Sequence, residues 1–126
     1  MADNIKENIF VIQSDEGEGI IQLADYVVTS IVALAVTEVD GVSKLTGDIT
    51  RDLIAMLGKK SLSKGIRVVY DENKLRVAVS VEIKYGYNIV DVSTSIQKKV
   101  KQSLYTMTGL ECDVVNVRVS GIDFSE

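Results

Sequence analysis

The sequence predicts a single α+β domain. Three features carry this prediction: an alternating apolar and polar run over residues 74–85, an amphipathic helical pattern between Asn88 and Gly109, and an earlier apolar segment of helical spacing that ends before Gly41. Alternation of apolar and polar residues is typical of a strand with one buried face. Apolar residues four positions apart are typical of a helix with one buried stripe. The predicted order is strand, helix, connector, hairpin, helix, strand, which gives one antiparallel or mixed sheet with two helices on one face.

Residues 1–16 are expected to form a flexible acidic leader in front of a domain that spans residues 17–126. Between Met1 and Asp25 the chain has six acidic residues and one lysine. The simplest interpretation is a solvated tail, and the alternative is an acidic arm that pairs with a basic surface elsewhere. Within the leader, the apolar residues 9–12 predict a short added strand.

A short strand over residues 20–23 is expected to lead into the first helix. Asp25 is the predicted N-cap, because its carboxylate can accept hydrogen bonds from the free N–H groups of the first turn. Apolar residues then recur at helical spacing at Val27, Val28, Ile31, Val32, Ala35 and Val39. Asp40 and Gly41 are expected to end this helix, because glycine readily adopts the left-handed conformation found after helix ends.

Residues 42–64 predict a polar connector with a short helix inside it. Between Lys44 and Arg67 there are six basic residues and two acids, in contrast to the acidic first quarter of the chain. A hairpin follows, with its turn at residues 71–73. Its second strand places Leu75, Val77, Val79, Val81, Ile83 and Tyr85 on one face. The polar opposite face predicts a sheet that is covered on one side only.

Gly86 is expected to end the hairpin, and Asn88 is the predicted N-cap of the second long helix. The buried stripe of this helix is predicted at Val92, Ile96, Val100, Leu104 and Met107, with Lys98, Lys101 and Gln102 on the solvent side. Gly109 is the predicted C-cap. The last strand is expected over about residues 112–119, with Val115, Val117 and Val119 on one face.

The composition favours an interaction domain over an enzyme. The chain has no histidine and only one cysteine, Cys112, so it lacks the side chains that most often titrate near neutral pH and that hold zinc. No catalytic residue, metal ligand or cofactor site is therefore predicted. A net charge of −4 makes nucleic acid an unlikely partner, because such binding depends on neutralising phosphates.

The sequence predicts no signal peptide and no transmembrane segment of its own. The longest apolar-rich segment, residues 26–39, is shorter than the ~20 apolar residues that a spanning helix needs. A single cysteine also fits a reducing compartment. The expected location is the cytoplasm.

The best candidate for an interaction surface is a set of lysines in the connector and on the second helix: Lys59, Lys60, Lys64, Lys98 and Lys101. The simplest interpretation is solvated surface charge. The alternatives are a contact patch for an acidic partner, for another copy's acidic arm, or for RNA. An RNA-binding module is the minor alternative, because no Gly-x-x-Gly loop or pair of aromatic residues on a central strand is present.

An ordered set of strings resembles one known family. The strings are Gly19-Ile20-Ile21-Gln22-Leu23-Ala24-Asp25-Tyr26-Val27, Val39-Asp40-Gly41-Val42, Lys64-Gly65-Ile66-Arg67-Val68, Tyr85-Gly86-Tyr87-Asn88-Ile89, Met107-Thr108-Gly109-Leu110-Glu111, and Val115-Asn116-Val117-Arg118-Val119 followed by Gly121. Together they resemble the alkaline shock protein family, the envelope stress response proteins of Gram-positive bacteria, over about residues 17–124.

The resemblance implies a small cytoplasmic protein without catalytic residues that self-associates as a homo-oligomer. Some members are held at the inner membrane face by a separate membrane-anchored partner and act in envelope homeostasis. The alternative that the resemblance implies is a regulatory partner of a fatty-acid metabolism enzyme such as acetyl-CoA carboxylase or a fatty-acid kinase. The shared strings do not separate these two branches.

Overall fold

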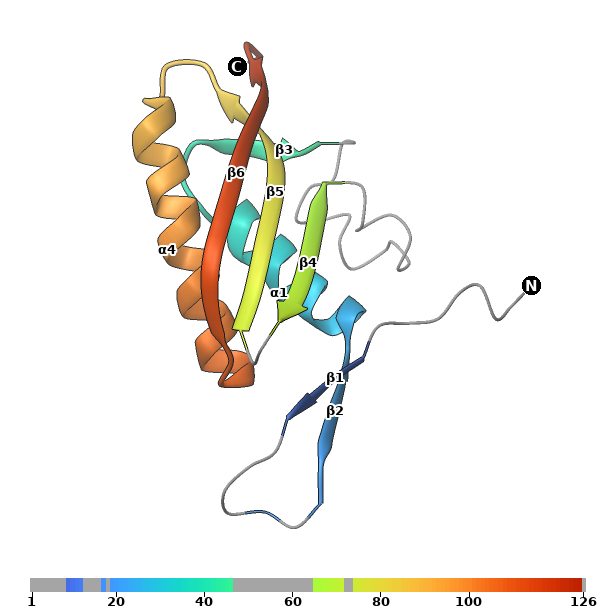
Figure 1. Cartoon of the computed structure of the whole chain (residues 1–126). Helices are drawn as coiled ribbons and strands as arrows, with labels where there is room; N and C mark the ends of the chain where they lie inside the picture. The colour runs from blue at the N-terminus through green and yellow to red at the C-terminus, as the bar shows by residue number, and fades with distance from the viewer. Residues whose placement is uncertain (1–8, 13–16, 18, 47–64, 72–73, 126) are drawn as a thin grey trace, which may run out of the picture.

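The computed structural model describes residues 9–12, 17, 19–46, 65–71 and 74–125. Its elements in chain order are β1 (Ile9–Ile12), β2 (Ile21–Ala24), α1 (Asp25–Thr37), β3 (Val42–Leu45), β4 (Ile66–Asp71), β5 (Lys74–Lys84), α4 (Ile89–Thr108) and β6 (Glu111–Asp123). Figure 1 shows α1 and α4 together behind one face of the four-stranded sheet. The predicted α+β fold, with two helices on one face, is confirmed.

Strand β5 is the centre of the sheet. Strand β6 runs parallel to it, from Glu111 opposite Lys74 to Asp123 opposite Lys84. On the other side of β5, β4 pairs antiparallel with its first half and β3 with its second half. A parallel neighbour requires a crossover connection, and α4 supplies it. The sheet is therefore mixed, which is one of the two predicted arrangements.

The first two strands form a separate antiparallel ribbon. Ile9 pairs with Ala24 next to α1, and Ile12 pairs with Ile21 at the opposite end. Figure 1 shows this ribbon projecting from the start of α1, away from the four-stranded sheet. The predicted added strand at residues 9–12 is confirmed, and the strand predicted at residues 20–23 pairs with it as β2.

The core is an aliphatic layer between the sheet and the two helices. The fully buried positions of α4 are the predicted stripe residues Ile96, Val100 and Leu104, with Val92 almost completely covered. They pack with buried residues of α1 and β5: Val28, Val32, Ala33, Ala35, Val36, Leu75, Val77, Val79, Val81 and Ile83. Burial of these apolar faces stabilises the domain by about 25 cal/mol for each Å² removed from water.

Of the four predicted helix ends, two are confirmed and two are corrected. Asn88 caps α4, since its Oδ1 accepts a hydrogen bond from the backbone N–H of Asp91 at 2.9 Å, and Gly109 follows the helix with a φ of 76°. The N-cap of α1 is Ala24, not Asp25, and no side chain caps that end. Asp25 is the first helical residue, where a negative charge still interacts favourably with the helix dipole. α1 ends at Thr37, with Glu38 as its C-cap in the right-handed conformation, and so stops before the predicted end at Asp40 and Gly41.

The connector prediction is corrected at its start, where Val42–Leu45 form strand β3 rather than part of the connector. Only two of these four residues are apolar, so the strand depends on its backbone pairing with β5. The short helix predicted further along the connector lies outside the described residues.

Two residues placed in the predicted core are exposed. Met107 is 67% exposed although its direction matches the buried stripe of α4, so its exposure comes from its place in the last turn. Tyr85 is 71% exposed, because β5 ends at Lys84 and the chain turns there.

Candidate functional site

The lysines predicted as an interaction surface do not form one described patch. Lys59, Lys60 and Lys64 lie outside the described residues. Lys98 and Lys101 are exposed on α4, three positions apart, and therefore neighbours on the helix surface. They belong to the helical layer, whereas the open surface of the sheet faces the other way.

The open surface is formed by alternate side chains of β4, β5 and β6 that point away from the helices. Its central residues are Arg67 and Val69 of β4, Arg76, Ala78 and Ser80 of β5, and Val114, Asn116 and Arg118 of β6. Three of the four arginines of the chain are in this set, which we call the arginine face. No described helix or strand covers it (Figure 1).

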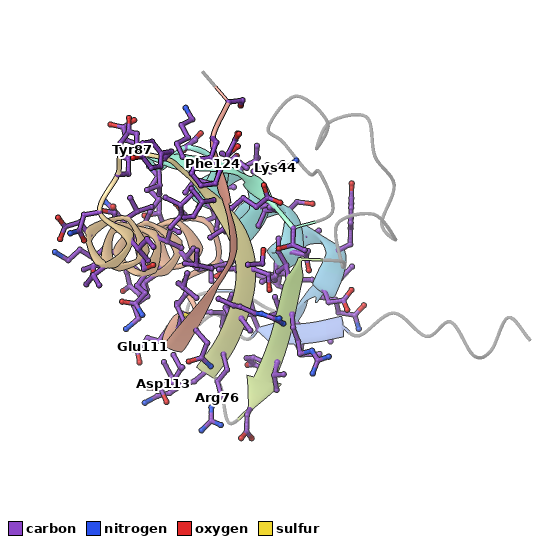
Figure 2. All side chains as sticks on the ribbon, turned by 90° about the horizontal axis from the view of Figure 1, so that it is seen from above. Lys44, Arg76, Tyr87, Glu111, Asp113 and Phe124 are labelled. Atoms are coloured by element: carbon purple, nitrogen blue, oxygen red, sulfur yellow. The ribbon has the colours of Figure 1, made fainter. Side chains whose placement is uncertain are left out.

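The strand register fixes the spacing of the three arginines. Arg67 lies opposite Ala78, two residues along β5 from Arg76. With strands about 4.8 Å apart and a rise of about 3.3 Å per residue, the Cα atoms of Arg67 and Arg76 are roughly 8 Å apart. Arg118 lies opposite Ser80 on the far side of β5. Figure 2 shows Arg76 extending from the sheet away from both helices.

The charges on this side of the sheet are distributed unevenly. In the described residues none of the three arginines forms an ion pair. Acidic groups lie toward the ends, where Glu82 is 3.9 Å from the Nζ of Lys44, Glu111 lies opposite Lys74, and exposed Asp113 lies in the β6 bulge next to the partner of Arg76. The centre of the face is therefore basic, with exposed donors for an anionic partner.

One end of the domain exposes a group of large apolar side chains. They are Tyr85, Tyr87, Ile89, Val90 and Phe124, each between 44% and 71% exposed. The rings of Tyr85 and Phe124 are in contact, with centroids 5.2 Å apart, and the N–H of Tyr85 donates to the carbonyl of Asp123. Large apolar side chains that are exposed close together are typical of interaction surfaces. We call this group the aromatic end.

The described residues offer little catalytic material. None of their buried side chains is polar or charged, and no group of three or more histidine, cysteine or acidic side chains could hold a metal ion. Burial raises the pKa of the Cys112 thiol, and the positive charge of Lys101 only partly opposes this. A raised pKa disfavours the thiolate, which is the nucleophilic form.

Sequence reasoning did not single out the arginine face, although the alternation along the hairpin already placed two of its arginines on the polar side. Arg67 and Arg76 fall on the polar side of the predicted hairpin. Arg118 joins them only because β6 pairs with β5 in parallel. The signal that would have found it is the order strand, helix, strand, in which a long helix permits a parallel return.

Comparison with known proteins agrees with the motifs. The model of the alkaline shock protein 23 family, described as having a cell envelope-related function, matches residues 13–124. The chain belongs to this family. The resemblance inferred from the ordered strings is thereby confirmed.

Several family relatives resemble the chain over most of its length. Spy1614 of Streptococcus pyogenes serotype M6 is 34% identical over 107 residues, covering 83% of this chain and 88% of that protein. YqhY of Bacillus subtilis strain 168 is 29% identical over 106 residues, which cover 84% of this chain and 78% of that protein. A stress response regulator gls24 homolog of S. pyogenes serotype M3 is 27% identical over 103 residues, covering 81% of this chain and 58% of its own length.

Among solved structures, a MamM CTD variant aligns with a TM-score of 0.49 at 11% identity, covering 79% of this chain and 96% of that one. The nickel form of another MamM CTD variant aligns with a TM-score of 0.47 at 10% identity, and the alignment covers 77% of this chain and 98% of that one. In the described part of the chain, no helix is both long enough and apolar enough to cross a membrane.

Proposed function

We propose that this chain is a non-enzymatic scaffold of the envelope stress response that works by self-association in the cytoplasm. Family membership supplies the link to the cell envelope. The observation that carries the scaffold role is the uncovered arginine face. Exposed arginines and valines on a flat sheet suit a protein contact, since arginine is enriched at interfaces and pairs well with carboxylates.

The residue types in the described core support a role in binding rather than in catalysis. General acid–base chemistry needs groups whose pKa is tuned by burial or by close charged neighbours. The described core holds no buried polar side chain. The pKa of Cys112 is raised, which favours the unreactive thiol over the thiolate.

Light scattering coupled to size-exclusion chromatography tests self-association. The purified full chain is expected to show a mass that rises with concentration across the micromolar range. A single monomer mass up to several hundred micromolar would contradict the scaffold role. Repeating the series at low and high salt separates charged contacts, which salt weakens, from apolar ones.

A second contact is favoured by the aromatic end. We propose that this apolar group docks a membrane-anchored partner, which holds the scaffold at the inner face of the membrane. The alternative occupant is an enzyme of fatty-acid metabolism. Tyrosine and phenylalanine that are exposed together bury large apolar area at low entropic cost when a partner covers them.

Fractionation of cells that express the chain distinguishes these occupants. The wild-type chain is expected in the membrane fraction, and a Tyr85→Ser/Phe124→Ser variant is expected to move to the soluble fraction. Tyr105→Ser, at a residue 62% exposed on α4, is the matched control and is expected to behave as wild type. Recovery of a soluble carboxylase or kinase with the wild-type chain, without membrane association, would instead support the enzyme-regulator alternative.

A further inference from the structure

We propose that the acidic run of one copy, in the segment that joins β1 to β2, docks on the arginine face of a second copy. The run consists of Asp15, Glu16 and Glu18. This inference rests on the proposed self-association and names the two surfaces that meet.

The chain divides its charge between these two surfaces. The first 25 residues carry a net charge of −5, whereas the whole chain carries −4, so the remainder carries +1. The three arginines of the arginine face form no ion pair in the described structure. Opposite charge that is separated along one chain favours pairing between copies and steers their encounter.

The geometry of the ribbon favours a second copy over the same chain. β2 joins α1 directly at Ala24, and the register places the Ile12–Ile21 pair at the end farthest from α1. The acidic run connects these two far residues. The ribbon projects away from the four-stranded sheet (Figure 1), so the Ile12–Ile21 end, which the acidic run joins in sequence, lies outside the sheet that carries the arginine face.

Apolar residues on both surfaces support the same contact. Val11, Ile20 and Ile21 of the ribbon region are 44%, 53% and 50% exposed. Ile12 and Leu23 of the ribbon pack against the core, and a partner that covered the exposed residues would stabilise the ribbon further. On the arginine face, Arg76 lies between Val69 and Val114, which are 48% and 36% exposed. Each surface thus combines charge with apolar area.

Arginine is the side chain best suited to this pairing. Its planar guanidinium can bind a carboxylate through two parallel hydrogen bonds and remains charged at any physiological pH.

A charge-swap experiment on the full chain tests the proposal. The face variant is Arg76→Glu/Arg118→Glu and the leader variant is Asp15→Lys/Glu16→Lys. Each alone places like charges on both surfaces, and is expected to weaken self-association at least about tenfold at low salt, since each reversal both removes an exposed ion pair and adds a repulsion. Mixing the two variants restores opposite charges across the contact and is expected to restore association to near the wild-type level.

The matched control is Lys98→Glu/Lys101→Glu. It changes the net charge by the same amount as the face variant, but on α4, and is expected to associate as wild type. The restored mixture also shows that both variants are folded, and a urea midpoint near the wild-type value checks each separately.

The outcomes separate this proposal from the scaffold role. If the wild-type chain associates and both variants associate equally well, the charged contact is wrong and the scaffold role stands. If both variants weaken association and their mixture does not recover it, direct pairing of the two surfaces is also wrong. A wild-type chain that stays monomeric contradicts both proposals.

Discussion

Gly41 packs against the ring of Tyr87 so closely that it has no room for a side chain. A β carbon built on Gly41 would lie 2.7 Å from Cδ2 of Tyr87 and 2.7 Å from Cγ2 of Val92. Gly41 also has a φ of 96°, a backbone conformation that residues with a side chain rarely adopt. This contact joins the turn after α1 to the start of α4, so one residue holds the two helices at the same end of the domain.

Gly41→Ala is expected to destabilise the fold by about 2–4 kcal/mol, combining a left-handed backbone cost with overpacking. The measurement is the free energy of unfolding in urea. Gly86→Ala is the control, because Gly86 has a φ of 100° and a β carbon added there would have no heavy atom within 4 Å. It is expected to show only the backbone cost, about 1–2 kcal/mol. Equal losses at both glycines would contradict the role given to Tyr87.

Shortening the side chain at two positions of α4 should have very different effects on the stability of the fold. Leu104 is fully buried, and Leu104→Ala is expected to cost about 2–5 kcal/mol through lost burial and the cavity left behind. Met107 is 67% exposed, and Met107→Ala is expected to change stability by no more than about 0.5 kcal/mol. Urea unfolding of both variants checks this, and a large loss at Met107 would mean that another surface covers it.

The contrast between these positions shows where sequence reasoning succeeds. The stripe Val92, Ile96, Val100 and Leu104 is predictable because helical periodicity identifies the inward direction of each side chain. Met107 shares that direction. Its burial depends on how far the neighbouring layers extend along the helix, which periodicity does not encode.

The candidate site shows a different limit. Alternation along the hairpin is enough to place Arg67 and Arg76 on the outer face. Adding Arg118 requires the partner, direction and register of β6, which are properties of chain pairing. Local charge density points to the lysines instead, and the two described ones lie on a helix, away from the sheet face. Strand β3 escapes prediction for a related reason, since its four residues carry no alternating pattern of their own.

Acid should weaken a contact at the end of the sheet. Asp123 accepts hydrogen bonds from the side chain and backbone N–H of Ser125 and from the hydroxyl of Ser43. These donors, the Ser125 hydroxyl first, lower the pKa of Asp123 from 3.8 to about 2. Because the folded state favours the ionised carboxylate, its contribution to stability is full above about pH 4 and is lost as the pH falls toward 2.

Two serine variants test this assignment. Ser125→Ala is expected to return the pKa of Asp123 toward its usual value more than Ser43→Ala does, because the Ser125 hydroxyl is the stronger cause. NMR titration of the Asp123 carboxyl carbon measures both. An unchanged titration in the two variants would assign the lowered pKa to the backbone N–H of Ser125 and the charge of Lys44.

The cysteine gives a test of how the neighbouring helix affects the sheet. Burial raises the pKa of Cys112, and the positive charge of Lys101 opposes this. Alkylation of Cys112 at pH 8 is therefore expected to be slower than that of a small unhindered thiol, because less thiolate is present. Lys101→Glu is expected to slow alkylation further, by about twofold, because a surface charge is screened by solvent and has a small effect.

Lys98→Glu serves as the control, since Lys98 is not among the groups that shift the pKa of Cys112. If alkylation is unchanged in Lys101→Glu, or if its pH profile has a midpoint below that of a free thiol, the thiol is activated by a group that this geometry does not identify.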